Sequence, residues 1–478
     1  MQTSERPLGE TPLSATAAQP EFRVVIAGGG VAALEAVIAL SELGRSGLEI
    51  ELICPDREFT YRAMSVAQPF GIKARPGLDL AAFCSEHGAE LHPGRLAEVW
   101  PQQQRVLLDS GEEIFYDALL VALGAVPYDA LPGTLNFRGP ADVAPFGALL
   151  DELEGGEVRR LVFAVPAEVL WPLPLYELAM LTAHQLGERG VDGVDLSFVT
   201  HEPGPLEIFG SETSDHIVEL LHRLGITTIV GRTPSRFEDG QLWLDDGSRL
   251  QAERVVSLPG LRVPLVPGLP HGSHGFIGAN AEMAVDGLDR VWAAGDATWF
   301  PIKQGGLAAQ QAEVAVAGIA AAAGVEVART PFRPIIRGAL LTGAEPEFMR
   351  KEVDGEAGAD VATAPLWWPP AKVAGRRLAP YMARHWSQHG GDPLLPMEDL
   401  QAPESEGHDR EVEHREALAL SLRWADVDAH AGDYRQALRW LDVAEKLNLT
   451  LPRTYEERRG QWLERIGHPG YAAEDSER

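Results

Sequence analysis

The sequence predicts an α/β protein made of two Rossmann-like dinucleotide-binding folds, the second inserted in the first, followed by a C-terminal α-helical hairpin. Residues 23–54 contain a buried strand, a glycine cluster, a stretch of helical period and a second strand, which is the βαβ order of a parallel sheet. The same order begins again at Leu161. A strand at 290–294 and an alanine-rich helix from Gly306 then return the chain to the first sheet.

Each element is predicted from a short apolar run or a helical period. In the first fold these are a strand at 23–27, a helix at 31–43, a strand at 48–54 and an antiparallel insertion at 106–116. In the second fold they are strands at 161–165, 195–200 and 254–258, helices at 175–186 and 214–224, and a hairpin at 237–250.

Changes in amino-acid composition along the chain predict the domain boundaries. In order they are a disordered tail (1–20), the first fold (21–150), the inserted fold (151–285), the return to the first fold (286–330), a Pro- and Trp-rich region (331–400), a charged linker (401–413) and a helical segment (414–478). In the last segment, small residues such as Ala425 and Ala437 around Gly432 resemble one tetratricopeptide unit. Its helices either cap the body or offer a docking surface to a protein partner.

The composition argues against several classes of function. The chain has 478 residues and a formal net charge of −29, from 41 basic and 70 acidic side chains. Nucleic acids attract basic patches, so we expect no nucleic-acid partner. No apolar run reaches 18 residues, so we expect no transmembrane segment, while a peripheral membrane contact stays open. Two cysteines in so long a chain fit a cytoplasmic location, and we expect no metal site.

The first glycine loop predicts a dinucleotide phosphate site. It reads G-x-G-x-x-A, with Gly28 for the tight turn, Gly30 for close approach to a pyrophosphate and the small Ala33 for helix packing. The phosphates would then lie at the positive end of the helix dipole. Cys54 stands where an acidic residue usually binds the ribose, so either Asp56 or backbone groups take that role. Cys54 itself is either a small buried residue or a reactive thiol.

A second signature resembles the flavoproteins that have two dinucleotide folds. An apolar strand at 291–294 ends in Gly295-Asp296, and residues 116–125, with Gly124 near the end, match the crossover strand of that family. The resemblance covers residues 22–330 and implies an FAD cofactor. It further implies that Asp296 binds a ribityl hydroxyl or orders a water that bridges to the phosphates.

The segment after Asp296 looks like the flavin-lining segment of sulfide:quinone oxidoreductases and type II NADH dehydrogenases. It contains Lys303, Gln304 and the pair Gly305-Gly306 at a predicted helix start. Glycines there permit close backbone approach, and helix N–H groups stabilise negative charge on a reduced flavin. Lys303 either adds positive charge to this edge or is a solvated lysine. Lys303 and Gln304 are candidate catalytic residues.

An earlier loop matches the family's adenine- and flavin-lining loop. It contains Tyr61 and Arg62, which are candidates for stacking and for phosphate contact.

The second fold departs from the pattern that binds NAD(P)H. Residues 165–177, where a glycine loop is expected, contain no glycine and three prolines. Proline offers no N–H to a phosphate, so the sequence argues against NAD(P)H binding. Trp171, Tyr176 and Glu177 are instead candidates for a wall that faces the flavin, the alternative being an inert, repacked loop. Sulfide:quinone oxidoreductases use cysteines near the flavin, and no cysteine follows Cys84, which argues against sulfide chemistry.

These features predict an FAD-dependent oxidoreductase that moves electrons from an unidentified small-molecule donor to a quinone-like or protein acceptor. The flavin supplies the redox chemistry, and the protein supplies electrostatics and access. Two alternatives stay open. One is an NAD(P)H dehydrogenase with an atypical nicotinamide site, and the other is a flavin-bound sensor or scaffold.

Overall fold

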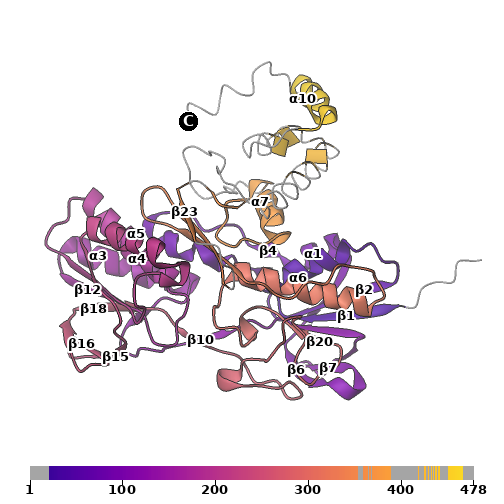
Figure 1. The fold of residues 1–478 in the computed structure, drawn as a ribbon, viewed down its shortest axis with the longest axis horizontal. Coiled ribbons are helices and arrows are strands. Elements are labelled where there is room, and N and C mark those ends of the chain that lie inside the picture. The colour runs from indigo at the N-terminus through magenta and orange to yellow at the C-terminus, as the bar shows by residue number, and fades with distance from the viewer. Residues whose placement is uncertain are drawn as a thin grey trace, which may run out of the picture.

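The computed structural model describes residues 21–353, 359–363, 365–367, 369–388 and 451–466, together with single positions between 418 and 441. Figure 1 shows two α/β folds side by side, with the helix at residues 378–388 on their upper side. The expected tail (1–20) and linker (401–413) lie outside the described residues.

A parallel sheet of five strands forms the first fold, in the order β20-β9-β1-β2-β5. Its strands are β1 (Phe22–Ala27), β2 (Leu48–Cys54), β5 (Ala89–Pro93), β9 (Ala118–Val121) and β20 (Val291–Ala293). Residues 24–27 of β1 and all of β9 are buried because helices cover the sheet, which suits their apolar sequences. The helices of this fold are α1 (Val31–Ser41), α2 (Leu80–Glu86) and α6 (Gly305–Ala322), and α1 packs against α6.

A second parallel sheet forms the other fold, in the order β11-β18-β12-β13-β14. Its strands are β11 (Leu135–Asn136), β12 (Arg160–Ala164), β13 (Asp195–Val199), β14 (Ile226–Ile229) and β18 (Arg254–Ser257). Its helices are α3 (Val143–Gly155), α4 (Leu173–Glu188) and α5 (Ser211–Arg223). This whole fold lies in sequence between β9 and β20, which are neighbours in the first sheet. The predicted α/β class with an inserted second fold is therefore confirmed.

Small antiparallel sheets are attached to the two folds and connect them. The ribbon of β10 (Val126–Tyr128) and β19 (Gly260–Arg262) carries the chain from one fold to the other in both directions. The remaining strands are β3 (Glu58–Phe59) with β4 (Leu78–Asp79), β6 (Leu96–Trp100) with β7 (Arg105–Leu108) and β8 (Glu113–Phe115), and β15 (Pro234–Glu238) with β16 (Gln241–Leu244) and β17 (Arg249–Gln251). The 3-10 helices are η1 (Arg62–Phe70), η2 (Pro101–Gln103), η3 (Pro140–Asp142), η4 (Glu207–Phe209), η5 (Ser273–Gly275) and η6 (Gly295–Ala297).

The Pro- and Trp-rich region forms structure that the sequence did not predict. It contains an antiparallel sheet of β21 (Ile335–Leu340), β22 (Glu347–Glu352) and β23 (Asp360–Ala362), followed by α7 (Leu378–Gln388). Helix α7 is held against the first fold, since the indole of Trp386 donates to the Pro76 carbonyl at 3.1 Å. The hydroxyl of Tyr381 donates to Glu86 at 2.7 Å in the same way.

Helix α10 (Arg453–Arg465) and the described positions of the preceding segment share a small core of their own. Ala425, Ala437, Leu441 and Trp462 are buried in it. Gly432 has a φ of +86°, as a left-handed turn residue does. Most of the expected tetratricopeptide-like hairpin lies outside the described residues, so it stays a prediction. Among the described helices, none combines the length and the apolar character needed to cross a membrane.

Candidate functional site

The carboxyl ends of β1, β9 and β20 meet at one edge of the first sheet, where Gly28 follows β1. A Cβ atom on Gly28 would lie 2.0 Å from the Ala122 carbonyl oxygen that follows β9, and the Gly28 φ is +125°. Both facts require glycine. The Gly28 N–H also donates to Ile53 at 2.8 Å, so the turn is tied to β2. The predicted role of Gly28 as the tight turn therefore has a geometric basis.

Gly30 differs from Gly28 because it faces open space. It is the residue before α1, its φ is −90°, and a Cβ there would meet no atom within 4 Å. Backbone strain therefore does not explain this glycine. Ala33, one turn into α1, is fully buried, as close helix packing requires. The positive end of α1 is thus left uncovered at Gly30, which is the arrangement that binds phosphate.

Cys54 lies directly beneath the glycine loop. A Cβ atom on Gly29 would lie 2.4 Å from the Cys54 sulfur, so this thiol occupies the space under the loop. Burial raises the pKa of the Cys54 thiol, which keeps it protonated at neutral pH. Of the two readings of Cys54, the geometry favours the packed residue. Asp56 is exposed beyond the end of β2, where it remains our candidate for the ribose.

The second signature packs onto the first. Gly295 has a φ of +80°, and a Cβ there would lie 3.3 Å from the Ala32 side chain in the first turn of α1. Its N–H donates to the Gln311 side chain of α6 at 2.7 Å. Two glycine motifs about 265 positions apart in the sequence are therefore in contact beside the N-termini of α1 and α6.

Three charged candidates gather around η6. Burial raises the pKa of the Asp296 carboxyl, while the positive charges of Lys303 and Arg62 oppose that rise. Burial also lowers the pKa of Lys303 to about 8, and Asp296 opposes that change. The Lys303 ammonium donates to the Thr298 carbonyl at 2.5 Å and to the Phe300 carbonyl at 2.6 Å. Lys303 is therefore an anchor of its own loop and a charge partner of Asp296, not a solvated lysine.

The start of α6 is closed by a segment from the C-terminal region. A Cβ on Gly305 would lie 2.9 Å from a methyl group of Val373, and one on Gly306 would lie 3.5 Å from the Ala374 carbonyl oxygen. Gln304 caps this helix position, and its side-chain amide donates to the Arg337 carbonyl of β21. The other polar atom of that amide, Oε1, is buried without a hydrogen-bond partner.

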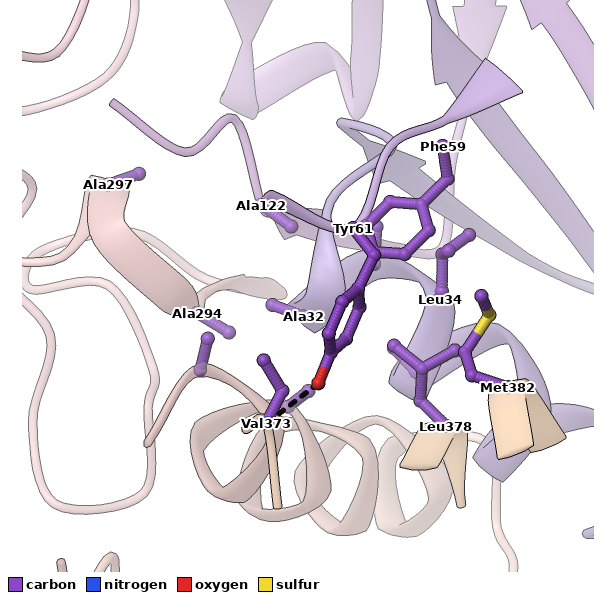
Figure 2. Close-up of a cluster of buried hydrophobic side chains, with 14 of the residues drawn as sticks. Ala32, Leu34, Phe59, Tyr61, Ala122, Ala294, Ala297, Val373, Leu378 and Met382 are labelled. Carbon is purple, nitrogen blue, oxygen red and sulfur yellow. Dashed lines mark hydrogen bonds between the residues drawn. The ribbon is translucent and has the colours of Figure 1, made fainter. Parts of the chain in front are cut away.

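Tyr61 joins the same segment to the first fold, as Figure 2 shows. Its ring lies among Ala32, Ala294 and Val373, and its hydroxyl oxygen accepts the Val373 N–H at 2.8 Å. The Tyr61 ring is also packed edge-to-face with the ring of Trp386, with 4.7 Å between the ring centroids. Tyr61, the sequence-based candidate for stacking on a cofactor, thus positions residues 371–374. Nothing in the sequence signals this contact, which spans 312 positions.

Glu177 forms a buried ion pair with Lys372, a residue that sequence reasoning missed. The Glu177 side chain is fully buried, and its Oε1 accepts from the Lys372 ammonium and from the Leu341 N–H. The ammonium also donates to the Ala339 carbonyl at 2.8 Å. Burial raises the pKa of Glu177 and lowers that of Lys372, while their mutual attraction opposes both changes. Among the residues that the structure describes, Oε2 of Glu177 has no hydrogen-bond partner.

The loop before α4 lacks the features of a phosphate site. Pro172 caps the helix and Pro174 lies in its first turn, so neither position has an N–H. The N–H groups of Leu175 and Tyr176 donate to the Pro172 carbonyl. Trp171 packs at a tilt against Phe209, with 5.9 Å between the ring centroids. Trp171 therefore covers this end of the second fold.

The comparisons with known proteins agree with this geometry. The family model of pyridine nucleotide-disulphide oxidoreductases matches residues 22–161 and 176–322, which is more than half of the chain. The chain belongs to this family. The match is interrupted over residues 162–175, which contain Trp171 and all three prolines of this loop.

Individual relatives are distant. Demethylphylloquinone reductase NdbB of Synechocystis is 25% identical over 297 residues, which cover 57% of this chain and 71% of the relative. The sulfide:quinone oxidoreductase of Aquifex aeolicus has a TM-score of 0.66 at 18% identity, covering 71% of this chain and 86% of that one. The ferredoxin reductase of the CYP199A2 system of Rhodopseudomonas palustris has a TM-score of 0.53 at 19% identity, covering 70% and 83%. The likeness to the solved structures shows the fold.

Members of this family are FAD-dependent oxidoreductases, so the predicted cofactor and enzyme class are confirmed. The residues present fit FAD. Gly30 leaves the α1 N-terminus open to a pyrophosphate. Among the described residues, the buried Oε1 of Gln304 at the N-terminus of α6 has no hydrogen-bond partner, which fits a helix start that faces a polar cofactor.

A buried carboxylate of α1 fixes the start of α7. The two oxygens of Glu35 accept the N–H groups of Arg377 and Leu378, each at 2.8 Å. The guanidinium of Arg377 binds Glu42 and Glu313. Burial and the nearby Glu313 carboxyl raise the pKa of Glu35 to about 8. This cluster fixes the C-terminal end of the segment that carries Lys372 and Val373.

We predict that the two loop glycines respond differently to alanine. Gly28→Ala collides with backbone at a positive φ, so we expect a loss of more than about 4 kcal/mol of stability or no folded protein. Gly30→Ala should stay within about 1 kcal/mol of the parent, because the site is open and φ is ordinary, yet reduce FAD affinity at least roughly tenfold. Thermal unfolding of the apoprotein and FAD titration by flavin fluorescence test this, with Gly147→Ala in α3 as the control. Unchanged FAD affinity in Gly30→Ala would contradict the assignment.

The Glu35 cluster predicts a pH-dependent stability. The folded-state pKa of about 8 lies above the ordinary 4.5, so the unfolded state releases its proton first. The stabilising contribution is complete below about 4.5 and is lost progressively as the pH rises from there to about 8. Glu35→Gln cannot ionise, so its melting temperature should rise relative to that of the parent as the pH increases over this range. If the melting temperatures of the two proteins instead change with pH in parallel, Glu35 ionises with an ordinary pKa and the prediction is contradicted.

Proposed function

We propose that this chain is an FAD-dependent reductase of a small quinone-type acceptor, in which the pair of Glu177 and Lys372 handles protons beside the flavin. The observation that carries the proposal is the burial of this ion pair next to the segment that closes the α6 N-terminus. The similarity to a demethylphylloquinone reductase and to a sulfide:quinone oxidoreductase supports the acceptor class.

Reduction of a quinone to a quinol consumes two electrons and two protons. Bound FAD, once reduced by the donor, would supply both electrons and one of the protons. The chain then has to supply the second proton. The opposite pKa shifts of Glu177 and Lys372 bring their proton affinities closer together, which favours proton exchange within the pair. Lys372 would donate a proton to a quinone oxygen and recover one through Glu177. The unpartnered Oε2 of Glu177 leaves an oxygen at which that proton is accepted or replaced.

The remaining candidate residues take supporting roles in this proposal. Asp296 and Arg62 bind the ribityl and pyrophosphate part of the cofactor, and Lys303 balances the charge of Asp296. Gln304 directs its free Oε1 to the flavin from the α6 N-terminus. The N–H groups at Gly305 and Gly306 stabilise the negative charge of the reduced ring.

We predict that removal of the pair slows quinone reduction by roughly 100-fold or more, because general acid catalysis typically contributes that much. The flavin is reduced by light under anaerobic conditions, so no natural donor is needed, and its reoxidation by a soluble quinone is followed in a stopped-flow instrument. The double variant Glu177→Leu with Lys372→Met removes both charges and avoids leaving one buried and unpaired.

Glu154→Gln is the matched control, since Glu154 binds Gln185 and Arg189 at the opposite end of α4. It should reoxidise at the parental rate. A double variant that keeps full FAD content and also reacts at the parental rate would overturn the proton role. A parent whose reduced flavin does not react with quinones would overturn the acceptor class.

A further inference from the structure

The second fold keeps the acidic residue that a nucleotide-binding fold uses for ribose. In such folds an Asp or Glu after the second strand accepts hydrogen bonds from the ribose hydroxyls. In this chain β13 is that strand, and Glu202 follows its last residue by three positions. The first fold ends its second strand at Cys54 and has Asp56 two positions later, so each fold has an acid just beyond its second strand.

Glu202 is fully engaged by side chains of its own fold. Its Oε2 accepts a hydrogen bond from the Tyr176 hydroxyl at 2.7 Å and another from the Thr200 hydroxyl at 2.9 Å. The Leu206 N–H is a third donor to the same carboxylate. These donors oppose the rise in the Glu202 pKa that burial causes. Two hydroxyls on one carboxylate oxygen are also what a ribose would provide.

Tyr176 is fixed where it stands. It lies in the first turn of α4, its side chain is fully buried, and its ring stacks on Phe198 with 4.0 Å between centroids. Burial and the adjacent Glu202 raise the pKa of the phenol well above its ordinary value, so the hydroxyl remains a donor. Tyr176 and Thr200 already donate to one oxygen of Glu202, and burial and the stack on Phe198 hold the Tyr176 ring there. A ribose hydroxyl would have to compete with both donors for that oxygen.

We propose that Tyr176 and Thr200 occupy the ribose site of the second fold with their own hydroxyls, and that they determine specificity by excluding NAD(P)H. The ribose position is filled by Tyr176, and the phosphate position before α4 is filled by prolines. The donor of this enzyme is therefore a reductant other than a nicotinamide nucleotide. This inference deepens the proposed function, since it concerns which class of donor reduces the flavin.

The test uses the FAD-loaded protein and adenosine monophosphate, which carries the ribose hydroxyls but transfers no electrons. By isothermal titration the parent should show no saturable binding at millimolar nucleotide, and anaerobic NADH and NADPH should leave its flavin oxidised. Tyr176→Ala opens the site and frees Glu202, so it should bind the nucleotide at least about tenfold more tightly than the parent. The 2′,3′-dideoxy nucleotide should bind this variant roughly tenfold more weakly, because it lacks the hydroxyls that Glu202 accepts.

Two variants complete the comparison. Glu202→Gln added to Tyr176→Ala should abolish the preference for the ribose hydroxyls. Tyr455→Ala is the matched control, because the Tyr455 hydroxyl also donates to a carboxylate, that of Asp426, in the C-terminal helices. It should bind no nucleotide.

Saturable submillimolar binding of the nucleotide by the parent, or bleaching of its flavin by NADH, overturns the inference, and this measurement does not depend on how the variants fold. A folded Tyr176→Ala that gains no binding overturns the role of Tyr176. Quinone reduction by the light-reduced flavin involves no nucleotide, so failure here and failure of the proposed function are separate results.

Discussion

The structure depends on the close approach of backbone segments at the carboxyl edge of the first sheet. Gly28 lies against the carbonyl of Ala122, and Gly295 lies against the first turn of α1. Side chains at either glycine would separate β1, β9 and β20 where they end. Because neither glycine has a side chain, the loop after β1 and the turn after β20 converge beside the N-termini of α1 and α6.

The two folds share one architecture but differ in what lies at the equivalent edge. In the first, Gly30 leaves the helix end open. In the second, Pro172 and Pro174 remove donors, and Tyr176 engages the acid that follows β13. The second fold also contributes to the junction with the C-terminal region, since α4 carries Glu177 to Lys372 there. Function here follows from a few side chains on a common scaffold.

The sequence predicts those parts of the site that local patterns encode. The Gly28 loop and the Gly295-Asp296 turn each follow an apolar strand, and the inserted order of the folds follows from where these strands stand. The long-range contacts of Glu177 and Glu35 are not encoded by any local pattern. Lys372 is 195 positions from Glu177, and Leu378 is 343 positions from Glu35, with no periodic signal at either end. The antiparallel sheet of β21, β22 and β23 was missed for a related reason, since Pro- and Trp-rich texture resembles a loop when its tertiary partners are unknown.

The most direct test of the central claim is the flavin stoichiometry of the purified protein. FAD is released by denaturation, quantified from its visible absorbance and divided by the protein concentration. The helix start after the first strand is open in the first fold and is occupied by prolines in the second fold. We therefore expect one FAD per chain after reconstitution. A colourless protein that takes up no FAD, or one that binds two dinucleotides per chain, would contradict this account.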